Sequence, residues 1–327
     1  MARNGVATVS IILAVALSAI PALAGESGMG RRPPDLSGLW TNSSLTELER
    51  PTDFQSLVPT DAEAHTFEAA HRGKPPILGP LNNAVGGPES DWWERDVGLA
   101  RIRGQIRTSW IISPADGKLP FTPAAKAANQ ALRDRRRIDF DGPEARDLDE
   151  RCASVSAAGP PLDNGGLNDN YQLVQTRDHL AIYAEWMHAV RIVRLQPSGR
   201  TPRVEHPPAS VRFPMGDSIG RWEGAVLVIE TTNFQPADVA APNDDANADM
   251  RIVERITRTS PTELLYAFSV ANPARYSQTW DAEMSLRATK GPIYEYACHE
   301  GNYSLPGILA GARHEEAVTK AAVKRAP

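Results

Sequence analysis

From Tyr171 onward, apolar and polar residues alternate along the chain with a period of two residues, and clusters of turn residues interrupt the alternation. Successive side chains of a strand point to opposite faces, so this pattern predicts strands with one buried face. Turn residues at Pro197-Ser198-Gly199 and Glu223-Gly224 separate some of them. The predicted strands cover residues 171–176, 179–187, 189–195, 217–222, 225–232, 251–259, 262–271, 277–288 and 293–299.

The segments between these strands decide how the strands pair. None is long and periodic enough to form the crossover helix that parallel neighbours usually need. Antiparallel strands in sequence must close on themselves or stack, because an open sheet of this size would expose its edges. We therefore predict an all-β fold with few short helices. Its antiparallel, meandering barrel covers residues 162–313, and a C-terminal tail follows at 314–327.

Two short helices are predicted in the region before the barrel. Thr60 and Glu63 have the spacing of a capping box, in which each side chain bonds the other residue's backbone N–H, and Gly73 is a plausible stop. Thr122 followed by Pro123 provides a cap and then a proline at the first helical position, ahead of residues 124–137.

The rest of residues 25–161 is interrupted by Pro and Gly, which leaves room for short elements only. One stretch, residues 101–112, keeps a two-residue period, with Ile102, Ile106, Trp110 and Ile112 on one side and Arg101, Arg103, Gln105, Arg107 and Ser109 on the other. It predicts a single strand that covers a core on one face.

The first residues have the features of a secretory leader. Met1 to Arg3 is positively charged, Val6 to Ile20 is apolar, and Ala22-Leu23-Ala24 matches a cleavage site. We expect residues 1–24 to be removed and the mature protein to be periplasmic or secreted. No later apolar run approaches the length that spans a bilayer, so membrane insertion is not expected.

Charge and cysteine content narrow the choices further. A net charge of −5 argues against nucleic acid as a partner, because phosphate binding needs a concentrated basic surface. Cys152 and Cys298 would meet an oxidising compartment, which favours a disulfide between them over a metal-binding or nucleophilic thiol. None of the histidines stands in a metal-ligand motif, and we predict neither a metal nor another cofactor.

Several short blocks resemble known families. Gly38-Leu39-Trp40 is similar to the entry strand of lipocalin and calycin barrels. More specific blocks lie at Met215–Gly224, Val228–Phe234 and Tyr294–Tyr303. They resemble a large family of secreted bacterial proteins whose activity is uncharacterised, and the resemblance runs from Asp35 to about Arg313. It implies no reaction, and no catalytic residue follows from it.

One motif points to chemistry that its surroundings do not support. Gly216-Asp217-Ser218-Ile219-Gly220 matches the nucleophile elbow of α/β-hydrolases, which needs a helix directly after the serine. An apolar strand follows instead. We expect the two glycines to allow a tight bend or a bulge.

Ionisable residues are frequent within the predicted strands. Tyr183, Glu185 and Arg191 share parity and would point the same way. If that face lines the barrel interior, burial could tune Glu185 for acid–base work; otherwise the groups form a salt-bridged outer face or a satisfied buried network. The catalytic candidates are Glu185 as base, His188, Asp217 and His299 as a proton relay, and Arg191 as an anion stabiliser. The substrate-binding candidates are Tyr183, Trp186, Trp222 and Tyr296.

These residues leave three functions open. The first is an extracytoplasmic enzyme without a redox cofactor, a lyase, hydratase, isomerase or hydrolase, acting on a small apolar or aromatic molecule. The second is a periplasmic binding protein for such a molecule, since both functions predict a mostly apolar pocket. The third is a cell-envelope interaction module. The sequence predicts no oligomeric state.

Overall fold

The structure is a computed structural model, and it describes residues 33–71, 98–153, 156–164, 168–196, 203–235 and 249–325. The predicted leader, residues 1–24, and the predicted helix stop at Gly73 lie outside the described residues.

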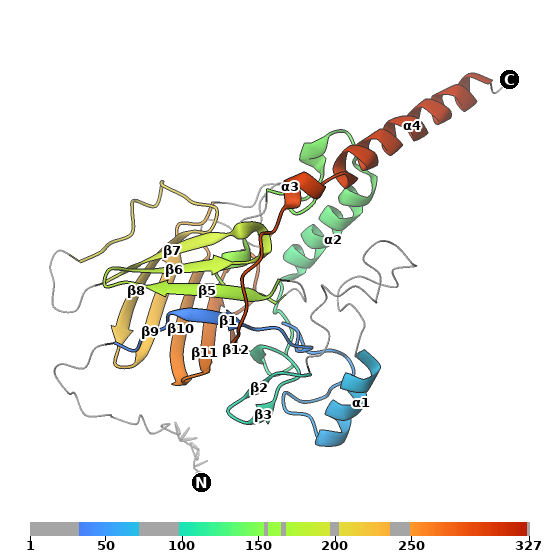
Figure 1. Cartoon of the computed structure of the whole chain (residues 1–327). Helices are drawn as coiled ribbons and strands as arrows, with labels where there is room; N and C mark the ends of the chain where they lie inside the picture. Colours follow the sequence, from blue (N-terminus) through green and yellow to red (C-terminus); the bar gives the residue numbers. More distant parts are fainter. Residues whose placement is uncertain are drawn as a thin grey trace, which may run out of the picture. The chain divides into compact units, whose positions relative to one another are not determined.

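A closed β-barrel of nine strands forms the centre of the fold, which confirms the predicted all-β barrel class (Figure 1). Around the barrel the order is β1, β5, β6, β7, β8, β9, β10, β11 and β12, and pairing of β12 with β1 closes the ring. The barrel strands are β1 Gly38–Thr41, β5 Asn170–Gln175, β6 His179–Ala184, β7 Val190–Leu195, β8 Asp217–Glu223, β9 Val226–Thr232, β10 Arg251–Ser260, β11 Glu263–Ala271 and β12 Trp280–Ala288.

One neighbouring pair departs from the predicted meander. Strands β7 and β8 are parallel, with Val193 opposite Ser218 and Leu195 opposite Gly220. The expectation that every pair is antiparallel was therefore wrong here. The connection between these two strands is long enough to return to the end at which β7 begins, and the part that the structure describes, residues 203–216, contains no helix.

The predicted strand at 293–299 was also wrong. Its place in the barrel is taken by β1, which pairs with β5 on one side and with β12 on the other. A closed barrel has no free edge, so residues 293–297 find no strand to pair with. They run as irregular chain into a short helix, α3 Cys298–Gly301, and then into α4 Ser304–Arg325, which includes most of the predicted tail.

The barrel interior is packed with side chains. Trp40, Tyr266, Ile182 and Leu264 are at most 1% exposed and belong to one continuous apolar cluster contributed by most of the barrel strands. Residues 156–164 also reach this cluster through Ala158 and Leu162. The sequence left undecided whether the barrel interior is a cavity. The structure shows that it contains a large apolar core.

Both predicted helices of the N-terminal region are confirmed. Helix α1 covers Asp61–His71, and the backbone N–H of Thr60 donates to Glu63 Oε2 at 2.8 Å while the N–H of Glu63 donates to Thr60 Oγ1 at 3.2 Å. Helix α2 covers Pro123–Ile138, and the Thr122 hydroxyl accepts from the N–H of Ala125. Two 3-10 turns, η1 Pro143–Ala145 and η2 Ser156–Ala158, follow α2.

The single strand predicted at 101–112 was wrong. It is divided into β2 Arg101–Ile102, β3 Gln105–Ile106 and β4 Ile111–Ser113. Arg103 and Gly104 have positive φ angles of 51° and 80°, which turn the chain into a hairpin. The predicted inner face is right in part: Ile102, Ile106 and Trp110 are buried, but Ile112 is only partly buried, and Arg107 and Ser109, predicted on the outer side, are buried as well.

Cys152 and Cys298 form the predicted disulfide. It joins the irregular segment after α2 to the start of α3, where the sequence had predicted the last strand, residues 293–299. None of the helices in the described ranges combines the length and apolar character that a membrane crossing requires.

Candidate functional site

The structure brings some of the predicted site residues together and separates the others. Glu185, Trp186, His188 and Tyr296 meet at one end of the barrel. Arg191 lies inside the barrel, and Asp217 begins β8. The remaining three are dispersed: Tyr183 is half-buried on β6, Trp222 packs against the barrel core, and His299 is exposed on α3.

Glu185 is 2% exposed and accepts three N–H donors. The Nδ2 atoms of Asn168 and Asn170 lie 3.2 and 2.7 Å from its two carboxylate oxygens, and the backbone N–H of Tyr294 donates at 3.2 Å. The carboxylate therefore connects β5 with the C-terminal segment. With these donors in place, little of its acceptor capacity is left for a substrate.

The shared face predicted for Tyr183 and Arg191 was wrong. A 3-10 turn, η3 Trp186–His188, interrupts the chain between β6 and β7. The register then places Val190 opposite Tyr183, and Arg191 opposite the buried Ile182. Because of this turn, Arg191 points inward while Tyr183 lies on the outer face of the barrel wall.

Arg191 belongs to a satisfied buried network. Its two terminal nitrogens donate to both oxygens of Glu254 at 2.7 Å, and its Nε donates to the carbonyl of Ala158. The Tyr266 hydroxyl donates to Glu254 and accepts the N–H of Leu162. Burial raises the pKa of the Tyr266 phenol well above its usual value, and the Glu254 carboxylate acts in the same direction. These contacts hold residues 156–164 to the barrel interior.

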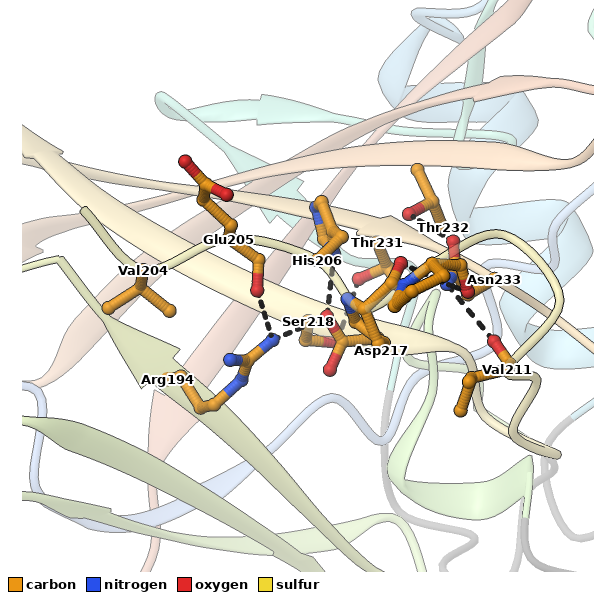
Figure 2. Close-up of polar contacts among 12 residues, drawn as sticks. Arg194, Val204, Glu205, His206, Val211, Asp217, Ser218, Thr231, Thr232 and Asn233 are labelled. Carbon is orange, nitrogen blue, oxygen red and sulfur yellow. Dashed lines mark hydrogen bonds and ion pairs between the residues drawn. The ribbon is translucent and has the colours of Figure 1, made fainter. Parts of the chain in front are cut away.

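An arrangement suited to proton transfer lies on the outer side of β8, where Figure 2 shows Asp217 between His206 and Arg194. Asp217 Oδ2 is 2.6 Å from His206 Nδ1 and 2.6 Å from Arg194 Nη2. A carboxylate only accepts hydrogen bonds, so His206 carries a proton on Nδ1. In the neutral imidazole, Nε2 is then the basic nitrogen. The His206 side chain is 25% exposed and that of Asp217 is 14% exposed, so the pair is accessible from solvent.

The segment that carries His206 is fastened by a buried asparagine. Asn233 has a φ angle of 58°, and its Nδ2 lies within hydrogen-bonding distance of the carbonyls of Pro207, Pro208 and Val211, as Figure 2 shows in part. The backbone N–H of Phe213 also donates to the Asn233 carbonyl. Residues 206–213 are thereby held along the end of the β8–β9 hairpin.

Gly216 explains the tight bend expected before Asp217. Its φ angle is 69°, and a Cβ there would lie 2.7 Å from the carbonyl oxygen of Thr232. Ser218 is 2% exposed and bonds to the hydroxyl of Thr231. Because Ser218 lies within strand β8 and points inward, it has none of the exposure that a nucleophile elbow provides.

Sequence reasoning missed His206, Arg194 and Asn233. His206 lies in a Pro-rich connection without a periodic pattern, and its partner Asp217 is eleven residues away. Arg194 has the alternation expected of a solvated strand residue. Only Asp217 was identified as a site residue, because no local pattern in the sequence indicates that it pairs with His206 and Arg194.

The described part of the chain has no group of three or more His, Cys, Asp or Glu side chains arranged to hold a metal ion. The pair of His206 and Asp217, which we call the dyad, can accept and return a proton, with Asp217 orienting the imidazole through the hydrogen bond to Nδ1. Comparisons with protein-family models, with curated proteins and with solved structures found no match to the chain.

Proposed function

We propose that the protein is an extracytoplasmic enzyme that moves protons on a small apolar or aromatic molecule without a redox cofactor. The observation behind the proposal is the contact of 2.6 Å between His206 Nδ1 and Asp217 Oδ2. In this proposal His206 is the general base and then the general acid of a lyase, hydratase, isomerase or hydrolase. The secretory features of residues 1–24 and the disulfide support the location.

His206 takes the role that the sequence suggested for Glu185. A base needs a lone pair that can reach the substrate, and His206 is partly exposed whereas Glu185 is buried and occupied by donors. Arg194 helps to hold the Asp217 carboxylate in place, because its guanidinium donates to the same oxygen that contacts His206.

The surroundings of the dyad favour an apolar substrate. Val211 and Phe213, on the segment that carries His206, are 42% and 39% exposed. Large apolar side chains at that exposure, on the same segment as His206, provide contact area for an aromatic or aliphatic group.

Solvent deuterium tests the proposal without knowledge of the product. The protein is incubated in D2O with a panel of aromatic and aliphatic esters, hydroxy acids and carbonyl compounds. Proton abstraction from carbon and its return leave carbon-bound deuterium in recovered substrate or product, which mass spectrometry detects; ester hydrolysis leaves none, so for the esters the readout is release of the acid. We expect His206→Gln and Asp217→Asn to lower incorporation at least about 100-fold.

The matched control is His179→Gln, since His179 is exposed on β6 and outside the dyad. It should retain full incorporation. A panel member that exchanges equally fast with wild-type protein and with His206→Gln would contradict the assignment of the base.

A second candidate function, binding without turnover, has one observation in its favour. A cavity of about 340 Å³ lies between α1 and the preceding loop, within the size range of small-ligand sites. Phe54, Phe67 and His71 line it, and the rings of Phe67 and His71 are stacked at 3.9 Å. Saturable binding of a panel compound that depends on Phe67, without deuterium incorporation, would favour this function.

A further inference from the structure

The segment between β12 and α3 crosses the end of the barrel without belonging to a sheet. We call residues 290–297 the strap; Figure 1 shows it as the red chain that leads from β12 to α3. The backbone N–H of Tyr294 donates to Glu185 Oε1 at 3.2 Å, and that of Tyr296 donates to His188 Nε2 at 2.6 Å. The strap thus presents the N–H groups of alternate residues to side chains of the barrel, as an extended peptide does.

An aromatic contact accompanies these hydrogen bonds. The Tyr296 ring packs on Trp186 with 4.8 Å between the ring centroids. Burial raises the pKa of the Tyr296 phenol, with Asp149 acting in the same direction. Donor groups and a ring side chain are the features by which grooves commonly recognise extended peptides.

The barrel side of this contact has an unusual backbone. Met187 and His188 are consecutive residues with φ angles of 55° and 52°. Residues with a Cβ rarely adopt this conformation, and it persists where the surrounding structure determines it, often at ligand-binding positions. Here the turn carries His188 Nε2 to the strap and leaves Trp186 beside Tyr296.

The strap is tethered at both ends. Its first end follows β12, and its second end is Cys298, bonded to Cys152. Asn302 adds a hydrogen bond from Nδ2 to the carbonyl of Glu150. A doubly tethered segment has a high effective concentration at its site, and removing one tether lowers that concentration.

We propose that Glu185, Trp186 and His188 form a recognition site for an extended peptide with an aromatic side chain, which the oxidised protein occupies with its own strap. Reduction of the Cys152–Cys298 disulfide releases one end of the strap, so that another peptide can bind at the site. A dithiol reductant supplies two electrons and two protons, the Cys152–Cys298 bond becomes two thiols, and the dithiol becomes a disulfide. The proposal is independent of the acid–base function assigned to His206.

The experiment uses a fluorescent synthetic peptide with the sequence of residues 292–297. Fluorescence anisotropy measures its binding to the full chain, oxidised or reduced with dithiothreitol, while circular dichroism monitors the barrel. We expect the reduced protein to bind at least tenfold more tightly than the oxidised protein. A peptide with serine at the position of Tyr296 should bind at least fivefold more weakly than the native sequence.

Two substitutions in the reduced protein locate the site. His188→Ala removes the acceptor for the Tyr296 N–H and should weaken peptide binding at least fivefold; His188 is exposed, so the fold should be retained. His179→Ala, another exposed histidine, is the matched control and should bind as wild type. Equal binding by the oxidised and reduced proteins, no binding by a reduced protein with a folded barrel, or no effect of His188→Ala would overturn the proposal.

If reduction unfolds the barrel, a second variant carries the test. Tyr296→Ser keeps the disulfide and removes the ring that packs on Trp186. The oxidised variant should bind the native peptide at least tenfold more tightly than the oxidised wild type. Binding no tighter than that of the oxidised wild type would contradict the proposed site.

Discussion

Arg191 shows that the role of a charged residue does not follow from its position in the sequence alone. The sequence identified Arg191 as an unusual ion within a strand, but its partner Glu254 is 63 residues away and nothing local connects them. Inside the barrel the pair is bidentate, and Tyr266 and Ala158 complete its hydrogen bonds. An arginine that looked like an anion stabiliser is thus part of the packing of the barrel interior.

The buried pair should be sensitive to removal of one partner. Glu254→Gln leaves the Arg191 guanidinium charged and unpaired at 3% exposure, and we expect a loss of about 3–5 kcal/mol in the free energy of unfolding, measured by urea denaturation.

Glu230→Gln is the control for that measurement. It breaks a comparable ion pair with Arg251 whose side chains are 30% and 52% exposed. The Arg251 hydrogen bonds hold the pKa of Glu230 below its usual range, but solvent screens the pair. We expect Glu230→Gln to lower the free energy of unfolding by at most about 1 kcal/mol. Similar losses for the two variants would contradict the structural role of the Arg191 pair.

Whole elements were predicted well where their signals are local. The capping box of α1 and the proline start of α2 depend on residues within one turn, and both helices begin where expected. The strand predicted at 101–112 was wrong because alternation alone does not reveal a turn, and Gly104 permits one. The alternation correctly marked Ile102 and Ile106 as buried, and the hairpin preserves that face, but after the turn Arg107 and Ser109 are buried against the prediction.

The cap of α1 can be tested at the level of the helix. Thr60→Ala removes the acceptor for the Glu63 N–H and should destabilise α1 by about 1 kcal/mol. Hydrogen exchange of α1 amides should accelerate roughly fivefold. Thr66→Ala is the control, since the Thr66 hydroxyl donates only to the Ala62 carbonyl within the same helix. Equal acceleration in both variants would argue against the cap.

At the scale of the molecule, closure depends on residues that are distant in sequence. Strand β1 completes the barrel by pairing Gly38 with Leu173 and Trp40 with Ala288. The disulfide then links segments 146 residues apart, both outside the barrel wall. Cross-linking over such a distance restricts the unfolded chain strongly.

Reduction of the disulfide should therefore lower global stability. In the loop-entropy account the link contributes about 5 kcal/mol, and we expect the melting temperature to fall by at least about 5 °C in calorimetry with dithiothreitol. Alkylation of the untreated, denatured protein should find no free thiol, as the structure has both cysteines bonded. An unchanged melting temperature, or two alkylated thiols, would contradict the bridge.

By itself the sequence determined where eight of the barrel strands lie, which of their apolar residues are buried in most cases, and how the helices begin, because period, turn chemistry and caps act over a few residues. The resemblance to lipocalin-like barrels marked Gly38-Leu39-Trp40 as an entry strand, and β1 confirms that strand. The tertiary structure decided the rest. The parallel β7–β8 pair, the two partners of β1 and the meeting of His206 with Asp217 all depend on how distant segments pair once the barrel closes. The pattern of side chains specifies which face of a strand is buried, but it does not specify which distant segment packs or pairs with that strand.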